Sequence, residues 1–386
     1  MLQSMHEKFE KLFNEAADVS AFAPGRINLI GEHTDYNGGY VFPAAIELGT
    51  YGLASRREDE QIQLYSNNFE SQGIVSFSLD ELVFDASHDW ANYPKGVIKY
   101  LSEQFKTINH GFNILIEGNI PNGASLSSSA SIELLTGWLI KALFDLDLER
   151  LELIKIGQRV ENHFMGVNSG IMDQFIIGLG KAEKAILLDT ATLEYQYVPA
   201  KFGDYVISIM NTNKRRSLTE SKYNERRAEC ESALAQLQQT LDIVTLGDLT
   251  PEQFETHKHL IKDDIERRRA KHAVLENERT KLAYTALSEN DFVQFGALLN
   301  ASHASLKDDY EVTGVELDTL AETAQQVEGV LGARMTGAGF AGCAIALVHK
   351  NNIPQLEETV SRIYTERIGY APSFYHVGIS DGVKSL

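Results

Sequence analysis

A predicted strand, a loop rich in glycine and serine, and a long apolar helix follow one another between residues 112 and 146. In "FNILIEGNI" (112–120), apolar residues alternate with others, as in a half-buried strand. "SIELLTGWLIKALFDL" (131–146) has the length and the leucine content of a buried helix. A strand that leads through a short loop into a buried helix indicates a fold that mixes α and β structure.

The loop between them, "PNGASLSSSAS" (121–131), predicts a phosphate-binding site. Gly123 allows a close backbone approach, and the small side chains leave the N-terminus of the next helix open. Backbone amides and the positive end of the helix dipole attract anions there, and serine hydroxyls add donors or hold a metal. The alternative is an ordinary capping loop, but three consecutive serines exceed what capping needs. The Gly-Lys-Ser/Thr ending of a P-loop is absent.

The charge and the cysteines exclude several classes of partner. The chain has 35 basic and 54 acidic residues and a net charge of −19. A surface this acidic repels nucleic-acid phosphates and anionic lipids, so we expect neither nucleic acid nor membrane as a partner. Cys230 and Cys343 form no CxxC motif and indicate no disulfide framework or zinc site. The N-terminus is too charged for a secretory signal and no apolar run could span a bilayer, so a cytoplasmic protein is expected.

The order of predicted elements divides the chain into two parts. Strands are predicted at 41–55, 61–66, 73–77, 112–120 and 205–212, and a hairpin at 185–199. From about Ser217, which has capping-box spacing with Glu220, charged helices predominate to about Gly329. Strands return at 332–336, 343–350 and 374–379, with one helix between the last two. We place a domain boundary near residue 200, which gives domains at 1–200 and 201–386.

A second glycine-rich stretch, "MTGAGFAGCAIALV", has Gly337, Gly339 and Gly342 in GxGxxG spacing. This spacing indicates a dinucleotide-binding fold only where a helix follows it. Residues 343–348 are instead a short apolar run, better interpreted as a buried strand. We therefore expect a tight turn between strands that approaches a ligand or another loop.

The stretch "GRINLIGEHTDYNGG" (25–39) gathers Arg26, Glu32, His33 and Asp35 around several glycines. Its Asn-Gly pair indicates a turn, so these polar side chains lie where the chain reverses and could face a ligand. A solvated, charged corner is the alternative interpretation.

Two further acids, Glu161 and Asp173, lie in "RVENHFMGVNSGIMDQF", 12 positions apart. Glu161 ends a helical stretch that begins near Leu151, and Asp173 follows two glycines. Phosphoryl transfer needs one carboxylate for Mg²⁺ and another near the accepting hydroxyl. Solvated acids would be the ordinary interpretation of this pair alone. Together with a phosphate loop and a polar turn, however, the pair indicates phosphoryl transfer to a hydroxyl group.

These stretches resemble the galactokinase family of the GHMP kinase superfamily. "GRINLIGEHTDYNGG" is similar to the galactokinase signature, and "GASLSSSAS" and "MTGAGFAGCAIAL" are similar to the second and third superfamily motifs. "WANYPKGVIKYL" and "GIMDQF" also resemble galactokinase segments, and the resemblance runs from about Pro24 to the C-terminus. It implies the α+β GHMP kinase fold, with an N-terminal domain like ribosomal protein S5 domain 2, a ferredoxin-like C-terminal domain, and the site between them. It implies transfer of the ATP γ-phosphate to the C1 hydroxyl of α-D-galactose, with Mg²⁺ as cofactor.

Carried over residue by residue, the resemblance assigns Asp173 as the catalytic aspartate and Arg26 as the arginine that stabilises the transition state. It assigns Ser129 and Glu161 to Mg²⁺. The sugar contacts would be Glu32, His33, Thr34, Asp35 and Tyr223. The nucleotide contacts would be Ser66, Gly123, Ala124, Ser125, Leu126, Ser127, Ser128 and Ser129. Ser125 and Ala341 stand where many relatives have glycine, which leaves the detail of those two loops open.

Two related functions are alternatives. An N-acetylgalactosamine kinase would need room beside C2 of the sugar. A non-enzymatic sensor of galactose and ATP would act by binding a transcriptional regulator, but the serine-rich loop of such proteins is altered, whereas residues 127–130 here match the active pattern. The favoured interpretation is a monomeric kinase whose partners are galactose and Mg-ATP.

Overall fold

The computed structural model describes residues 1–121, 123–214 and 219–386, and for residues 219–221 it describes the backbone alone. The side chains of the predicted capping pair, Ser217 and Glu220, lie outside the described residues.

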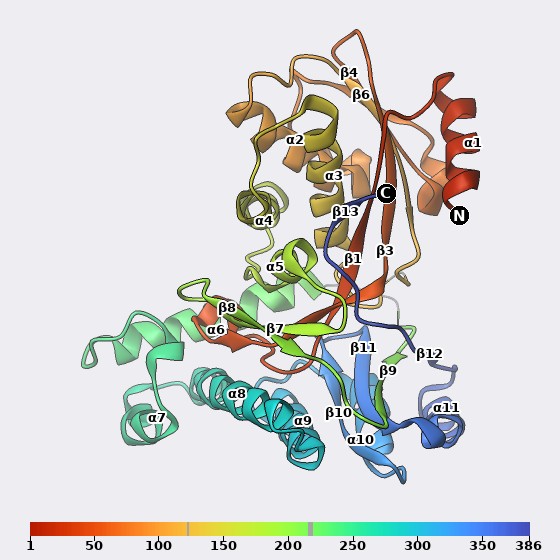
Figure 1. Ribbon diagram of the computed structural model, residues 1–386. Coiled ribbons are helices and arrows are strands. Elements are labelled where there is room, and N and C mark those ends of the chain that lie inside the picture. Colours follow the sequence, from red (N-terminus) through yellow and green to blue (C-terminus); the bar gives the residue numbers. More distant parts are fainter. Residues whose placement is uncertain (122, 215–218) are drawn as a thin grey trace.

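The first half of the chain is built on a six-stranded sheet in the order β13-β1-β3-β6-β4-β5 (Figure 1). Only the β4–β6 pair is parallel within it. A three-stranded sheet, β2-β7-β8, lies near the junction with the second half. The elements of this half are α1 (Leu2–Phe13), β1 (Val19–Asn28), β2 (Tyr40–Val41), β3 (Pro43–Arg56), β4 (Gln61–Ser66), β5 (Val75–Ser78), α2 (Asn92–Gln104), β6 (Phe112–Gly118), α3 (Ser128–Phe144), α4 (Arg150–Arg159), a π-helical turn (Val160–Met165), α5 (Met172–Leu179), β7 (Lys184–Asp189) and β8 (Tyr195–Pro199).

Helices cover both faces of the six-stranded sheet because its strands alternate apolar side chains inward and outward. Ile114 and Ile116 of β6 belong to the large core under α2, α3, α4 and α5. Leu115, between them, packs on the other face with Met5 and Phe9 of α1. Figure 1 shows α1 on the opposite side of β1 and β3 from α2 and α3.

The second half is built on a four-stranded sheet in the order β10-β11-β9-β12. Its elements, together with the last strand of the first sheet, are β9 (Tyr205–Asn211), α6 (Thr219–Leu237), α7 (Pro251–His257), α8 (Asp264–Ser288), α9 (Phe292–Asp308), α10 (Gly314–Gln325), β10 (Val330–Thr336), β11 (Cys343–His349), α11 (Ile353–Ile368), β12 (Ser373–Tyr375) and β13 (Lys384–Ser385). Alternate residues of β11 serve two cores: Ala344 packs with α10 and α11, whereas Ile345 packs toward the first half.

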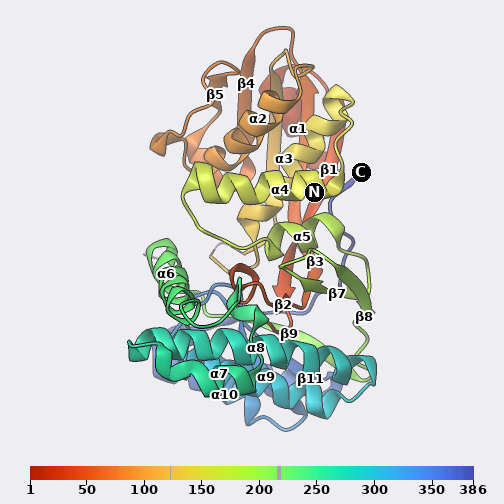
Figure 2. The same ribbon diagram turned by 90° about the vertical axis from the view of Figure 1, so that its left-hand side faces the viewer.

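The two halves share one apolar cluster, and the C-terminal segment of the second half joins the sheet of the first. Leu29 and Phe42 from the first half lie in the same core as Phe295 and Ile345 from the second. The C-terminal segment returns to the first half, where β13 pairs with β1. Figure 2, turned from the view of Figure 1, shows α6 at the junction of the halves. Residues before and after the predicted boundary near residue 200 therefore pack together in one core.

Most of the predicted elements are confirmed, and two of them differ from their predicted extent. The stretch predicted as a strand at 374–379 is a strand only at β12 and then a single bridge, Ile46 to Ile379. The helix predicted to end at Glu161 ends at Arg159 and continues as the π-helical turn. The GxGxxG spacing leads into strand β11 and not into a helix, as predicted.

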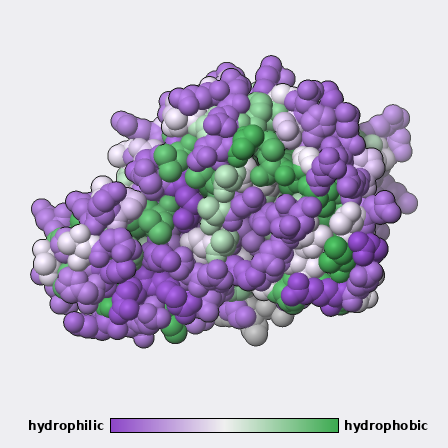
Figure 3. Space-filling model, turned by 90° about the horizontal axis from the view of Figure 1, so that it is seen from below, coloured by the Kyte–Doolittle hydropathy of each residue, from purple (hydrophilic) through white to green (hydrophobic). Residues whose placement is uncertain are grey.

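One face of the molecule shows how polar and apolar residues are distributed on the surface. Seen from below, the molecule is largely hydrophilic, with smaller apolar patches between (Figure 3). Among the described helices, none has the length and the apolar character needed to cross a membrane.

Candidate active site

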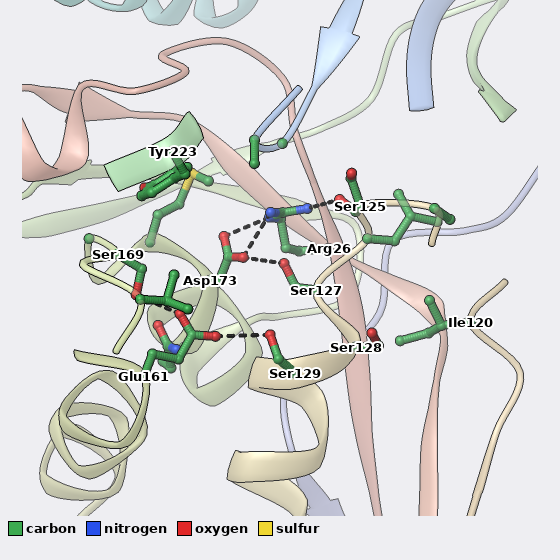
Figure 4. A pocket seen from close by; sticks show the side chains of 18 of the residues that line it. Arg26, Ile120, Ser125, Ser127, Ser128, Ser129, Glu161, Ser169, Asp173 and Tyr223 are labelled. Carbon is green, nitrogen blue, oxygen red and sulfur yellow. Dashed lines mark hydrogen bonds and ion pairs between the residues drawn. The ribbon is translucent and has the colours of Figure 1, made fainter. Parts of the chain in front are cut away.

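A cavity of about 570 Å³ lies between the two halves and gathers most of the predicted site residues (Figure 4). The predicted residues that line it are Arg26, Glu32, His33, Asp35, Gly123, Ala124, Ser125, Leu126, Ser127, Ser128, Ser129, Glu161, Asp173 and Tyr223. These residues come from four separate stretches of the first half and from α6 of the second. The fold thus brings the phosphate loop, the polar turn and the acidic pair to one place.

The phosphate loop connects β6 to α3 and needs three residues in the left-handed region. Gly123, Ser125 and Ser127 have φ values of 73°, 59° and 63°. Between them, the side chains of Ala124 and Leu126 are buried in the shared core, which fixes the loop from below. Because alternate residues are anchored, the serine side chains face the cavity, and exposed Ser128 begins α3 there. This is the open helix N-terminus that the sequence predicted.

Close backbone contacts hold this loop against β1. Gly25 lies beside a bulge in the β1–β3 pairing, and a Cβ there would come 2.6 Å from the Leu126 carbonyl oxygen. The Arg26 amide donates to the same carbonyl over 3.1 Å. The bulge therefore turns the Arg26 side chain toward the cavity while its backbone supports the loop.

The third motif supports the loop from the other side. Gly337 and Gly342 have positive φ values, and Cβ atoms there would come 2.8 Å from the Ser125 carbonyl and 2.1 Å from its Oγ. The predicted tight turn between strands β10 and β11 is therefore confirmed, and the loop it approaches is the phosphate loop.

Arg26 and Asp173 form a bidentate ion pair at the centre of the cavity (Figure 4). The Nε and Nη2 atoms of Arg26 each donate to a carboxylate oxygen of Asp173 over 2.8 Å, and Nη1 donates to the Ser125 carbonyl over 2.6 Å. The Ser127 hydroxyl also donates to Asp173. Burial works to lower the pKa of Arg26, but the nearby Asp173 and Glu32 carboxylates outweigh it and raise that pKa. Asp173 also sits in the first turn of α5, where the helix dipole favours a negative charge.

Glu161 lies beside the start of α3, on the π-helical turn after α4. Its Oε1 accepts a hydrogen bond from the Ser129 hydroxyl over 2.9 Å, and its Oε2 accepts one from Ser169 over 2.5 Å. Burial raises the pKa of Glu161, against the effect of these two hydrogen bonds. The result is a small cluster of oxygen atoms next to the phosphate loop, which could hold a hard cation.

Glu32 ties the polar turn to the second half of the chain. Its Oε1 accepts from the Gly337 amide over 2.8 Å and from Arg334 Nη1 over 3.2 Å. Burial raises the pKa of Glu32, while Arg334 and Arg26 oppose this rise. Arg334, which is fully buried on β10, also donates to the carbonyls of Asn28 and Leu29. The turn is thus held in place by a strand about 300 residues away in the sequence.

His33 is held by protein partners at both ring nitrogens. Nε2 lies 3.1 Å from the Ala338 carbonyl, which can only accept, so Nε2 carries the proton. Nδ1 therefore accepts from the Tyr36 hydroxyl over 2.7 Å, and that hydroxyl lies 2.7 Å from Tyr310. Burial is the main cause that lowers the pKa of His33 to about 3, so the ring is neutral near pH 7.

Asp35 faces the cavity close to Asp173. Its Oδ1 accepts from the Tyr36 amide over 3.1 Å, and its Oδ2 accepts from the Met172 amide over 3.4 Å. Burial, aided by the negative charge of Asp173, raises the pKa of Asp35 to about 7. A Cβ at Gly170 would lie 2.0 Å from Oδ2, so glycine is required for Asp35 to keep this position.

Tyr223, on α6, closes the cavity from the second half. Its ring centroid lies 5.5 Å from that of His33 and 5.5 Å from that of Tyr36. Burial is the main cause that raises the pKa of Tyr223 well above its usual value, so the hydroxyl stays protonated and can donate.

Two predicted contacts do not line the cavity. The Thr34 hydroxyl is buried against the carbonyls of Gly31 and Tyr40, where it stabilises the turn. Ser66, at the end of β4, caps the next turn by accepting from the Asn68 amide. Their predicted ligand contacts stay predictions.

Several residues that line the cavity are not predicted by the motifs. Ser169 contacts Glu161, Gln174 follows Asp173, and Tyr93, in the stretch "WANYPKGVIKYL", also lines the cavity. Of these three residues, Tyr93 and Gln174 lie in stretches that resemble the family. A single serine such as Ser169 carries no signal of its own.

Family models match the chain in three places. The "Galactokinase galactose-binding signature" matches residues 7–56, "GHMP kinases N terminal domain" matches residues 92–181, and "GHMP kinases C terminal" matches residues 283–366. A crystal structure of mevalonate kinase, 18% identical, covers 94% of this chain with a TM-score of 0.62, and all of that chain is covered. Fold and motifs together define a GHMP kinase, which confirms the predicted α+β class.

Much closer relatives narrow this class. The galactokinases of Staphylococcus saprophyticus and Staphylococcus carnosus are 79% and 72% identical over 386 residues, with 100% of each chain covered. A crystal structure of Lactococcus lactis galactokinase complexed with galactose is 55% identical, with a TM-score of 0.98 and 100% of both chains covered. The chain therefore belongs to the galactokinase family, whose members are ATP-dependent sugar kinases.

Proposed function

We propose that this enzyme transfers the γ-phosphoryl group of ATP to the C1 hydroxyl of α-D-galactose. The observation that carries the proposal is the Arg26–Asp173–Ser127 cluster, which lies in one cavity between the phosphate loop and the polar turn. The galactose-binding signature of the family covers that turn, and the similar Lactococcus lactis enzyme was crystallised with galactose. Asp173 therefore lies between the loop that would donate hydrogen bonds to phosphate and the turn that would accept them from sugar hydroxyls.

The reaction forms one bond and breaks one. The C1 oxygen of galactose attacks the γ-phosphorus, the bond from that phosphorus to the β–γ bridging oxygen breaks, and ADP leaves. The proton of the C1 hydroxyl passes to Asp173 or, as the new bond forms, to the phosphoryl group. The transition state is loose and spreads negative charge over the transferring oxygens, so positioning and positive charge are the main needs.

Three donors already engage Asp173, and this bears on its role. The two oxygens of this carboxylate accept two guanidinium hydrogen bonds and one serine hydrogen bond, which fix its orientation in the cavity. We infer that Asp173 mainly orients the C1 hydroxyl and that Arg26, which shares its charge with the incoming phosphate, stabilises the transition state. Proton transfer to Asp173 then comes late, when the oxygen has become acidic.

The nucleotide phosphates would lie on the loop of residues 123–129. Its open backbone at the start of α3, with the exposed Ser128 hydroxyl, offers donors to an anion despite the acidic surface. The side chains of Ala124 and Leu126 are buried, so their contribution would come from the backbone. Ser66 would contact the nucleotide only outside the cavity described above.

Magnesium is proposed to be held by Ser129 and Glu161. A hydroxyl and a carboxylate 2.9 Å apart beside the phosphate loop are the oxygen ligands that Mg²⁺ takes while keeping waters and substrate phosphates. When bound, it would neutralise charge on the β- and γ-phosphates. Ser169, on the far oxygen of Glu161, keeps that carboxylate turned toward Ser129.

The sugar would be held by Glu32, Asp35 and Tyr223, which line the cavity beside Asp173. His33 would contact it through its ring or backbone, because both ring nitrogens have protein partners. We propose that Thr34 acts by shaping the turn. We further propose domains at 1–200 and 201–386, from the order of the predicted elements. A cytoplasmic location, from the charged N-terminus and the lack of a long apolar run, and a monomeric state are also proposals.

A hexose panel tests this function. With saturating Mg-ATP, galactose should be phosphorylated at least roughly 10²-fold more efficiently in kcat/KM than glucose, because a displaced 4-hydroxyl leaves a buried acceptor unpaired. Galactose should also exceed N-acetylgalactosamine, and the product should be the 1-phosphate by ³¹P NMR. Equal efficiency on glucose, or a preference for N-acetylgalactosamine, would overturn the galactose assignment.

A further inference from the structure

Helix α6 of the second half is hydrogen-bonded to a loop of the first half at residues 166–170. The Asn168 amide donates to Asn224 Oδ1 over 3.0 Å, and Asn224 Nδ2 donates to the Gly166 carbonyl over 3.2 Å. Arg227 Nη1, one turn further along α6, donates to the Asn168 carbonyl over 2.8 Å. These three bonds, two from Asn224 and one from Arg227, are called the α6 clamp below.

The clamped loop supports both ends of the cavity. Ser169 donates to Glu161 Oε2, on the proposed metal side. Gly170, the next residue, lies directly against the carboxylate of Asp35 on the sugar side. A shift of this loop would therefore move a metal contact and a sugar contact together.

The same helix carries the residue that would cover the sugar. Tyr223 immediately precedes Asn224 and packs against His33 and Tyr36. The Arg227 guanidinium lies 5.8 Å from the centre of the Tyr36 ring. Contact with a sugar and the clamp are thus made by adjacent residues on one rigid helix, so they cannot move independently (Figure 4 shows Tyr223, Ser169 and Glu161 around the same space).

We propose that Asn224 and Arg227 are positioning residues that couple galactose binding to Mg-ATP binding. A sugar held by Tyr223 fixes α6, the α6 clamp fixes the loop, and Ser169 then holds Glu161 in the orientation that the metal needs. By linkage, Mg-nucleotide must strengthen galactose binding by the same factor. The inference rests on the proposed function, because it takes Tyr223 and Glu161 as sugar and metal contacts.

The test measures this coupling in the absence of turnover. Galactose affinity is determined calorimetrically with and without a non-hydrolysable ATP analogue and Mg²⁺, for wild type, Asn224→Ala and the double variant Asn224→Ala/Arg227→Met. We expect galactose to bind wild type at least about 3-fold more tightly when the nucleotide is present. That factor should fall toward 1 in both variants, with a raised Mg²⁺ midpoint for activity.

The control removes a neighbouring interaction of the same arginine. Arg227 Nε also donates to Glu231, an exposed residue that is not among those lining the cavity. Glu231→Gln should therefore keep the wild-type coupling factor and Mg²⁺ midpoint. Alanine is the best helix former, so Asn224→Ala should leave α6 folded, which circular dichroism and thermal unfolding would show.

Two results would overturn the coupling. One is a wild-type enzyme that phosphorylates galactose but binds it equally well with and without nucleotide. The other is an Asn224→Ala enzyme that weakens both ligands yet keeps the wild-type coupling factor, as a purely structural role would predict. Failure of galactose to bind wild type under any condition would instead contradict the proposed function itself.

Discussion

The proposed phosphate end and the proposed sugar end of the cavity are built in different ways. The phosphate end is largely one continuous stretch, residues 123–129, which is shaped by positive φ values and small side chains. The sugar end is a turn whose polar side chains are held by residues far away in the sequence. Arg334 and the Gly337 amide bind Glu32, and the Ala338 carbonyl binds His33.

The two arginine–carboxylate pairs show the same contrast. The Arg26–Asp173 pair opens to the cavity, with 27% of the Asp173 side chain exposed, so its partners can change when a ligand arrives. The Arg334–Glu32 pair has side chains 0% and 2% exposed, and it joins the two halves. The Arg26–Asp173 pair suits a role in the reaction, because its groups can replace hydrogen bonds to each other with hydrogen bonds to a ligand. The Arg334–Glu32 pair suits a structural role, because each buried charge is stabilised only while the other remains in place.

The largest expected effect follows from breaking the buried pair. Arg334→Met keeps much of the side-chain volume but leaves the Glu32 carboxylate buried without its cation and frees the carbonyls of Asn28 and Leu29. Removing one partner of such a pair costs about 3–5 kcal/mol of folding free energy. Chemical denaturation at pH 7 measures this loss. The double variant Arg334→Met/Glu32→Gln, which also removes the unpaired carboxylate, should recover part of the lost stability. An Arg334→Met variant as stable as wild type would contradict the structural role of this pair.

The next effect concerns the open pair. Asp173→Asn keeps the shape of the side chain but removes the charge that pairs with Arg26 and orients the accepting hydroxyl. We expect kcat to fall at least roughly 10²-fold, with galactose still bound and folding stability little changed. Turnover assays and calorimetry together check this. A variant with near-normal turnover would remove Asp173 from the reaction.

The contrast also explains what could be predicted from the sequence. The loop between a strand and a helix at 121–131, the strand after GxGxxG and most other strands follow from local patterns, and the structure confirms them. Phosphate binding by that loop stays a prediction. Arg334 was missed because a charged residue in a short strand such as "GARMT" resembles an ordinary edge position, and nothing local shows that Glu32 lies opposite. The family resemblance assigns Thr34 to the sugar, but no local pattern predicts that its hydroxyl donates to the carbonyls of Gly31 and Tyr40, and its sugar contact stays a prediction. Contacts across the halves depend on the whole fold, so motifs alone could not supply them.

A smaller effect should appear in the pH dependence of the sugar end. The pKa of Asp35 is raised from 3.8 to about 7 in the protein without ligand. Because a sugar hydroxyl donates to the ionised form, galactose binding without nucleotide should strengthen up to about tenfold between pH 6 and pH 8 and then level off. Asp35→Asn should bind more weakly with a flat profile. Calorimetry across this range decides, and a flat wild-type profile would exclude Asp35 as an ionised acceptor.

The same shift has the opposite sign for stability. A carboxyl whose folded pKa lies above its unfolded value contributes stability that is complete below the unfolded pKa of 3.8 and is lost as pH rises through about 7. Asp35→Asn, which cannot ionise, should therefore be more stable than wild type at pH 8 and not at pH 4. Thermal unfolding at both pH values separates this effect from sugar binding.

The smallest effect concerns Glu133, a carboxyl that lies behind the phosphate end, fully buried on α3. It accepts from Gln174 Nε2 over 3.0 Å, while Glu133 Oε1 and Gln174 Oε1 have no hydrogen-bond partner among the described residues. Burial, with the negative charge of Glu161 nearby, raises its pKa well above the usual value, which favours the protonated form. Its contribution to stability is then complete below pH 4.5 and is lost as pH rises through the folded pKa.

Glu133→Gln keeps the shape, cannot ionise and still offers a donor and an acceptor to Gln174. We expect kcat within about twofold of wild type and a stability gain on the order of 1 kcal/mol at pH 8 that disappears toward pH 5. Glu133→Leu is the comparison, because it leaves the Gln174 amide unpaired and should destabilise at every pH. If Glu133→Gln instead lost stability at pH 8, the carboxyl would be ionised in the folded enzyme. The phosphate end would then hold a third negative charge beside Glu161 and Asp173, and the contrast with the buried Arg334–Glu32 pair would fail there.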